Sequence, residues 1–140
     1  MKKEFIPYEQ ALALKELGFD EPCIAIYYSK DKSFSWHHHK DHTNDELVLE
    51  SGEFNISAPT FSQAFTWFRE KYNLAGFIGF RPNVKHFDCH IYDMSLSGKE
   101  YAQQRTMEEY NKDPKVGTYE EAELACLDKL ILIVTGTTES

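Results

Sequence analysis

Strand-like segments follow one another without an intervening helix at two places in this sequence of 140 residues. The first run covers residues 23–29 and 47–57, and the second covers residues 75–81 and 86–95. β-Branched and aromatic residues bounded by turn formers are typical of strands. Connections of hairpin length join strands in antiparallel fashion, whereas parallel strands need long crossovers. The sequence therefore predicts an antiparallel sheet of about four strands.

Three segments show the apolar periodicity of amphipathic helices. The first follows Pro7, which suits the first helical position, and ends at Gly18, after which Phe19 can fold back on the helix. The second begins at Thr60 and the third at Thr118, each with the spacing of a capping box. Because each helix has one apolar side, all three need a surface against which to bury it.

These elements predict an α+β fold in a single domain of residues 1–140. We expect the three helices on one face of the sheet, and two αββ halves followed by a closing helix fit the order of elements. Residues 30–45 are polar and rich in histidine, and we expect a loop there. Residues 135–140 should form a frayed C-terminus. Residues 99–111 are compatible with a helix, but their weak amphipathicity does not decide whether it belongs to the core.

Acidic residues outnumber basic ones, with 23 Asp and Glu against 15 Lys and Arg and a formal net charge of −8. Phosphate backbones are bound by clustered cations, and the longest basic run here is Lys2 and Lys3. Nucleic acid is therefore an unfavourable partner. No apolar segment approaches a membrane span and no signal-peptide core begins the chain. We expect a cytoplasmic protein without a membrane partner.

The three cysteines, Cys23, Cys89 and Cys126, are odd in number and widely spaced. Such a set does not indicate a disulfide framework. Buried free thiols in a reducing compartment are the interpretation we favour over a catalytic thiol.

Three polar side chains alternate along residues 86–95. His86, Asp88 and His90 should point to one face of a strand, with apolar residues between them on the other. Two imidazoles and a carboxylate can hold a divalent metal such as zinc or manganese and activate a bound water for hydrolysis. The alternative, which we favour, is a solvated polar face, because no helical metal-binding signature accompanies these residues.

A second group of histidines lies in the polar segment 30–45 and comprises His37, His38, His39 and His42. A loop does not hold ligands in place, so adventitious metal binding is the interpretation we favour. These residues would join the strand histidines only if the loop folded over that strand.

Aromatic and basic side chains point to a binding platform. Trp67 lies off the main apolar stripe of its helix, where an indole could stack on a base or anchor a partner. The alternative for Trp67 is the edge of the helix–sheet core. Tyr28, Arg81 and His90 would lie on the sheet face left uncovered by helices and could bind a nucleotide-like ligand. A homo-oligomer would also cover that face.

Three helical stretches carry a resemblance, namely residues 5–22 (FIPYEQALALKELGFDEP), 59–74 (PTFSQAFTWFREKYNL) and 118–130 (TYEEAELACLDKL). Over about a third of the chain, they resemble a family of small proteins of Bacteroidetes-type phages and prophages. The resemblance implies a non-enzymatic accessory protein of the bacterial host cytoplasm. It would bind a host protein or sequester a small nucleotide-like molecule, with an anti-defence role, and it assigns no catalytic residue or cofactor.

Two other classes of function stay open beside this binding protein. One is a small metal-dependent hydrolase that uses His86, Asp88 and His90. The other is a structural subunit of a particle, whose exposed strand edges pair with neighbours. The hydrolase would carry metal, the binding protein would hold a ligand without turnover, and the structural subunit would be oligomeric without a ligand.

Overall fold

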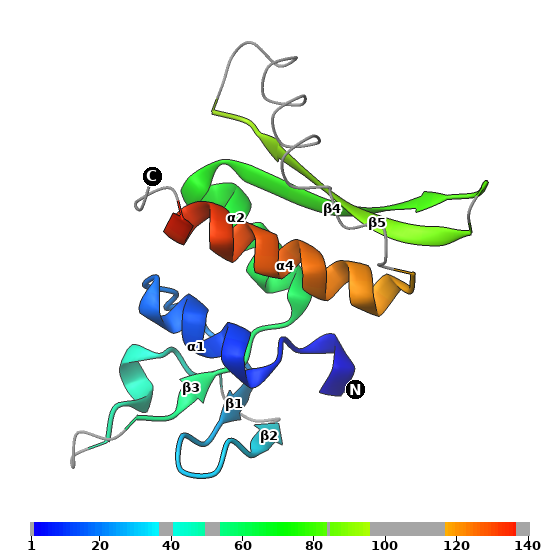
Figure 1. Cartoon of the computed structure of the whole chain (residues 1–140). Coiled ribbons are helices and arrows are strands. Elements are labelled where there is room, and N and C mark those ends of the chain that lie inside the picture. The colour runs from blue at the N-terminus through cyan, green and yellow to red at the C-terminus, as the bar shows by residue number, and fades with distance from the viewer. Residues whose placement is uncertain (1, 37–40, 50–53, 84, 96–116, 137–140) are drawn as a thin grey trace. The chain divides into compact units, whose positions relative to one another are not determined.

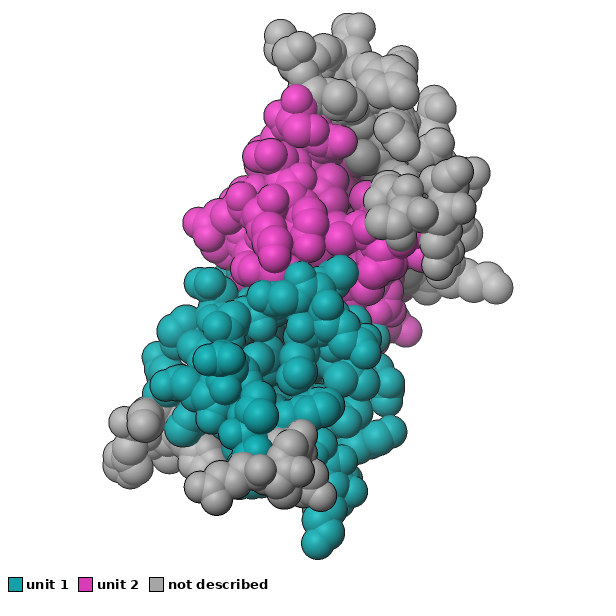
Figure 2. Space-filling model, turned by 90° about the vertical axis from the view of Figure 1, so that its left-hand side faces the viewer, with its two compact units in different colours: residues 1–62 teal, residues 63–140 magenta. Residues whose placement is uncertain are grey.

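Figure 1 shows a computed structural model of the chain. The residues that the structure describes are 2–36, 41–49, 54–83, 85–95 and 117–136. The chain divides into two compact units, residues 1–62 and residues 63–140, coloured separately in Figure 2. Both units combine helices with antiparallel strands, which confirms the predicted α+β class. Within these described ranges the strands form two sheets, of three and two strands, where we expected one sheet of about four.

The first unit is built around a short three-stranded sheet. Its elements are two short 3-10 helices (Lys2–Glu4 and Asp45–Leu47), helix α1 (Tyr8–Glu16) and strands β1 (Ala25–Tyr27), β2 (Phe34–Trp36) and β3 (Ile56–Ser57). The strand order is β2-β1-β3, and both pairings are antiparallel. β1 is thus the central strand and all three of its residues are buried, as its apolar sequence predicts.

The C-terminal end of α1 has the predicted geometry. Gly18 has a φ of 98°, and its N–H donates to the carbonyl oxygen of Lys15 at 3.0 Å. The N–H of Phe19 donates to the carbonyl oxygen of Leu14 at 2.9 Å, and both side chains are buried. At the other end the prediction is wrong by one residue. Pro7 is the N-cap, with extended backbone, rather than the first helical residue.

Part of the polar segment 30–45 forms a strand instead of the predicted loop. Phe34–Trp36 pairs with β1 because the ring of Phe34 packs against those of Tyr27 and Phe5, with centroids 5.5 and 5.2 Å apart. His42 donates its N–H to the carbonyl oxygen of Cys23 at 2.8 Å. The other three histidines of this segment, His37, His38 and His39, lie outside the described residues.

The second unit contains a hairpin and a long helix that packs against it. Its elements are helix α2 (Phe61–Tyr72), which starts just before the boundary, strands β4 (Leu74–Arg81) and β5 (His86–Asp93), and helix α4 (Tyr119–Gly136). β4 and β5 pair antiparallel from Leu74 opposite Asp93 to Arg81 opposite His86, which confirms the predicted hairpin. α4 packs against both strands (Figure 1).

Helix α4 begins where the sequence predicts. Its capping box is formed: the N–H of Glu121 donates to Oγ1 of Thr118 at 3.1 Å, and the N–H of Thr118 donates to Oε1 of Glu121 at 3.0 Å. Because α4 continues to Gly136, the frayed terminus predicted for residues 135–140 is wrong for its first two residues, and the rest lies outside the described residues. Residues 99–111 also lie outside them. In the described parts of the chain, no helix has the length and apolar character needed to cross a bilayer.

The two faces of the β4–β5 hairpin differ in chemistry. The face toward α4 carries the buried residues Cys89 and Ile91, together with Gly76. A Cβ atom at Gly76 would lie 3.0 Å from Sγ of Cys126 and 3.1 Å from Cδ1 of Leu130, so α4 approaches the strand closely there. Side chains alternate along a strand, and the opposite face therefore carries a separate set. That set is Ala75, Phe77, Gly79, Arg81, His86, Asp88, His90 and Tyr92.

Candidate functional site

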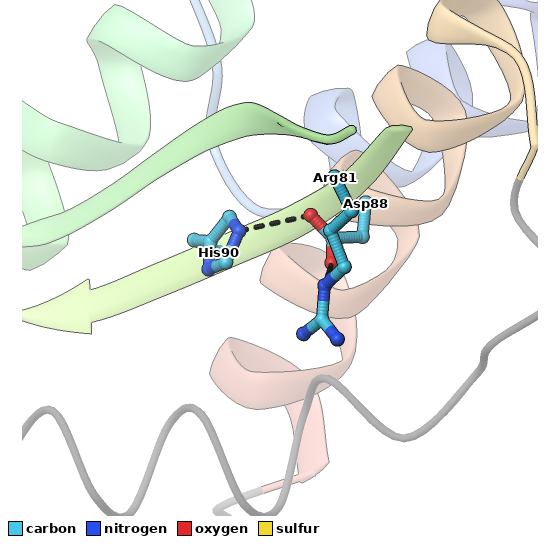
Figure 3. Close-up of polar contacts among 3 residues, drawn as sticks. All are labelled: Arg81, Asp88 and His90. Atoms are coloured by element: carbon cyan, nitrogen blue, oxygen red, sulfur yellow. Dashed lines mark hydrogen bonds and ion pairs between the residues drawn. The ribbon is translucent and has the colours of Figure 1, made fainter. Parts of the chain in front are cut away.

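Three residues of the hairpin face directed away from α4 form a polar triad (Figure 3). Nε of Arg81 forms an ion pair with Oδ2 of Asp88, and Nε2 of His90 lies 2.9 Å from Oδ1 of the same carboxylate. The side chains of Asp88 and His90 are only 14% and 17% exposed, whereas that of Arg81 is 55% exposed. Asp88 thus holds a guanidinium with one oxygen and an imidazole with the other.

The register of the hairpin explains why these three side chains meet. Asp88 lies opposite Gly79, and Arg81 lies two residues further along β4 on the same face. A Cβ atom at Gly79 would lie 2.7 Å from Nε2 of His90, so the imidazole occupies the space that a side chain would fill. A glycine within a strand often marks such a close approach of a neighbouring group.

A row of flat rings adjoins the triad on the same face. Phe77 is stacked on His90, with ring centroids 5.2 Å apart, and on Tyr92, with centroids 5.4 Å apart. Both pairs of ring planes make an angle of 17°, and the side chain of Phe77 is 44% exposed. The sequence interpretation did not include Phe77 and Tyr92. Strand alternation would have found them, because it places Phe77 on the face of Arg81 and Tyr92 on the face of His90.

The structure places the other predicted ligand-binding residues elsewhere. Tyr28 is exposed and belongs to the first unit, so it is no part of the hairpin face. Trp67 is only 7% exposed, because its ring packs edge-on against those of Phe68 and Tyr72. This burial leaves little of the indole for stacking on a base or anchoring a partner, and it fits the alternative place of Trp67 in the core. Arg81 and His90 are the two predicted residues that the structure brings together.

The three predicted metal ligands share one face of β5, as strand alternation predicts. The carboxylate of Asp88 is, however, engaged by Arg81 on one oxygen and by His90 on the other. Among the residues that the structure describes, no three His, Cys, Asp or Glu side chains are grouped so that they could hold a metal ion. A cation at Asp88 would have to displace the guanidinium.

The arrangement is suited to binding a flat, anionic molecule. Figure 3 shows the two terminal nitrogens of Arg81 pointing away from Asp88, so their N–H groups are directed away from the carboxylate. A guanidinium held by a carboxylate through Nε presents its remaining donors in a fixed direction, which favours recognition of phosphate or carboxylate oxygens. The exposed ring of Phe77 offers a surface on which a planar group can stack.

Comparison of the chain with protein-family models, with curated proteins and with solved structures gives no match. The resemblance to phage and prophage proteins therefore stays a prediction. It depends on residues 5–22, 59–74 and 118–130, and none of the residues of the hairpin face lies in these stretches. The candidate site is thus supported by its own geometry.

Proposed function

We propose that this protein binds a small nucleotide-like ligand on the exposed face of the β4–β5 hairpin and does not transform it. The observation that carries the proposal is the presence, on one face, of a carboxylate-held guanidinium and a row of stacked rings in which Phe77 is exposed. A base would stack on Phe77, and a phosphate would accept hydrogen bonds from the terminal nitrogens of Arg81.

The spacing along β4 supports such a ligand. Phe77 and Arg81 are four residues apart on the same face, which corresponds to about 13 Å along an extended strand. A nucleotide in an extended conformation can span this separation with its base at one end and its phosphates at the other. His90 lies between the two residues and continues the flat surface, because it is stacked on Phe77 and bonded to Asp88.

The environment of Asp88 favours binding over catalysis. A general base needs a carboxylate directed at the proton that it removes. Asp88 is 14% exposed and both of its oxygens are engaged within the triad, so its role is to position Arg81 and His90. In a phage or prophage accessory protein, such a face would sequester a nucleotide-like signal of host defence.

The experiment is a binding titration with purified protein and a panel of nucleoside mono-, di- and triphosphates and cyclic dinucleotides. Native mass spectrometry of untagged protein comes first, because a co-purified molecule would name the ligand. Stacking of one base on an aromatic ring contributes about 1–3 kcal/mol to binding. Phe77→Ala should therefore weaken binding by about 5- to 150-fold. Arg81→Ala should weaken the binding of phosphorylated ligands and leave that of the free nucleoside unchanged.

The matched control is Phe80→Ala, which removes an exposed phenylalanine of the same strand. Phe80 is 52% exposed, but it lies on the other face, where its ring packs against Phe87. This variant should bind the ligand like the original protein. The proposal would be contradicted if Phe77→Ala and Phe80→Ala lost the same amount of affinity for the ligand. It would also be contradicted if the protein turned the ligand over, or if it bound no nucleotide of the panel.

A further inference from the structure

Two of the three cysteines lie next to each other across the interface between α4 and the hairpin. Cys89 of β5 and Cys126 of α4 are both buried, and each thiol lies close enough to change the pKa of the other. Gly76 allows this approach, because a side chain there would collide with Sγ of Cys126. The pair is separated by 37 positions in the chain, and only the packing of α4 on β5 brings it together.

A lysine completes this buried cluster. Lys129 lies three residues beyond Cys126, close to one helical turn along α4, and its positive charge acts on the thiol of Cys89. The hydrogen bond from Cys126 and the positive charge of Lys129 lower the pKa of the Cys89 thiol, against the effects of burial and of the Asp88 charge. The hydrogen bond with Cys89 and burial raise the pKa of Cys126, and the charge of Glu123 acts in the same direction. Of the two thiols, Cys89 is therefore the one whose thiolate form its neighbours favour.

We propose that Cys89 and Cys126 are a redox-active dithiol that hydrogen peroxide converts into an intramolecular disulfide between β5 and α4. The Cys89 thiolate attacks one peroxide oxygen, the O–O bond breaks, and hydroxide leaves and takes up a proton as water. Cys89 is then a sulfenic acid. Sγ of Cys126 attacks the sulfur of Cys89, the S–O bond breaks, and the hydroxyl group leaves as a second water with the proton of Cys126. Two thiols are oxidised and one peroxide is reduced to two waters.

Hydrogen peroxide is the oxidant chosen for the test because it is smaller than disulfide reagents and the two thiols are buried. The exposed fractions of Cys89 and Cys126 are 3% and 0%. In a reducing compartment such a disulfide would be transient, which is the usual form of a redox-sensing pair. The inference does not depend on the nucleotide-binding proposal, because the two thiols lie on the opposite face of the hairpin from Phe77 and Arg81.

Cys23 provides a control within the same chain. Its thiol is equally buried, but it donates to the carbonyl oxygen of Glu21, and burial together with the charge of Asp41 raises its pKa to about 12. Cys89 and Cys126 belong to the second unit and Cys23 belongs to the first. We therefore expect Cys23 to stay reduced under conditions that oxidise the other two.

The test treats fully reduced native protein with increasing amounts of hydrogen peroxide, quenches it with acid, alkylates the unfolded chain and maps the peptides by mass spectrometry. The expected product is a monomer that has lost two hydrogen atoms, with Cys89 linked to Cys126 and Cys23 alkylated. Recovery of all three cysteines as alkylated thiols would overturn the proposal. Oxidation of Cys23 at the same rate, or disulfides only between chains, would also overturn it.

Two variants separate the attacking thiol from the resolving one. In Cys126→Ser the oxidation should stop at the sulfenic acid of Cys89, which can be labelled with dimedone. In Cys89→Ser no sulfenic acid should form, and Cys126 should stay unlabelled by dimedone. Lys129→Met should slow the oxidation of Cys89 at neutral pH by about tenfold, because the thiolate fraction falls as its pKa rises. Cys23→Ser should oxidise like the original protein. The disulfide mapping of the original protein tests the proposal by itself, even where a variant fails to fold.

Discussion

At the scale of single residues, glycine determines how closely two elements approach each other in the second unit. Gly79 leaves room for the imidazole of His90 above β4, and Gly76 leaves room for Cys126 and Leu130 of α4. In each case the neighbour occupies the position of the missing side chain. The candidate site and the thiol pair therefore both depend on a residue that has no side chain.

Gly76→Ala tests this dependence. The new Cβ would lie 3.0 Å from Sγ of Cys126 and 3.1 Å from Cδ1 of Leu130, and both atoms are buried. We expect a loss of about 1–3 kcal/mol in the free energy of unfolding, the usual cost of overpacking a core, measured by urea denaturation. The matched control is Gly117→Ala, whose Cβ would meet no atom closer than 3.8 Å. Equal stabilities of the two variants would contradict the packing described here.

At the scale of elements, local hydrogen bonds fix where helices begin and end. The capping box of Thr118 and Glu121 begins α4, and the paired hydrogen bonds of Gly18 and Phe19 end α1. These contacts lie within a few residues of each other along the chain, so a sequence pattern is sufficient to predict them.

The cap of α4 makes stability depend on pH. Hydrogen bonds from the N–H and the hydroxyl group of Thr118 lower the pKa of Glu121 in the folded state below its ordinary value of 4.5. A lowered pKa means that this carboxylate stabilises the fold fully above pH 4.5 and that the contribution is lost as the pH falls through the folded-state pKa. Melting temperatures of the original protein and of Glu121→Gln should therefore differ at neutral pH and converge in acid. A difference that stays constant between neutral and acidic pH would contradict this role of the carboxylate.

At the scale of the whole molecule, the net charge of −8 constrains how an anionic ligand is held. Steering by overall charge would repel such a ligand, so attraction has to come from local donors. On the described hairpin face, Arg81 is the cation that we propose for the phosphate. Binding should therefore depend on salt far less than the binding of nucleic acid does.

A titration at two salt concentrations checks this expectation. With one phosphate contact, the slope of log affinity against log salt should be no steeper than about −1, so affinity should change by about fourfold or less between about 50 and 200 mM salt. A slope several times steeper would indicate many phosphate contacts and a nucleic-acid partner. Arg81→Lys keeps the charge and should keep the slope, while the affinity falls because the fixed donor geometry is lost.

Some features of the second unit could be predicted from the sequence and others could not. The alternation of His86, Asp88 and His90 on one face of β5 follows from strand geometry alone. The pairing of Asp88 with Arg81 depends on the register of the hairpin, which the turn sequence did not specify. The burial of Trp67 was missed for a different reason, because its ring packs against Phe68 and Tyr72 of its own helix although it lies beside the apolar stripe.

By itself, the sequence determined the α+β class, the antiparallel pairing, the C-terminal end of α1, the capping box of α4 and the central, buried position of β1. All of these follow from periodicity and short-range hydrogen bonds. Only the tertiary structure decided that the strands form two sheets, that Asn44 is buried between the carbonyl oxygen of Phe19 and the N–H of Ser57, and that Cys89 meets Cys126. These contacts join residues far apart along the chain, and their geometry depends on how whole elements pack, which no local pattern encodes.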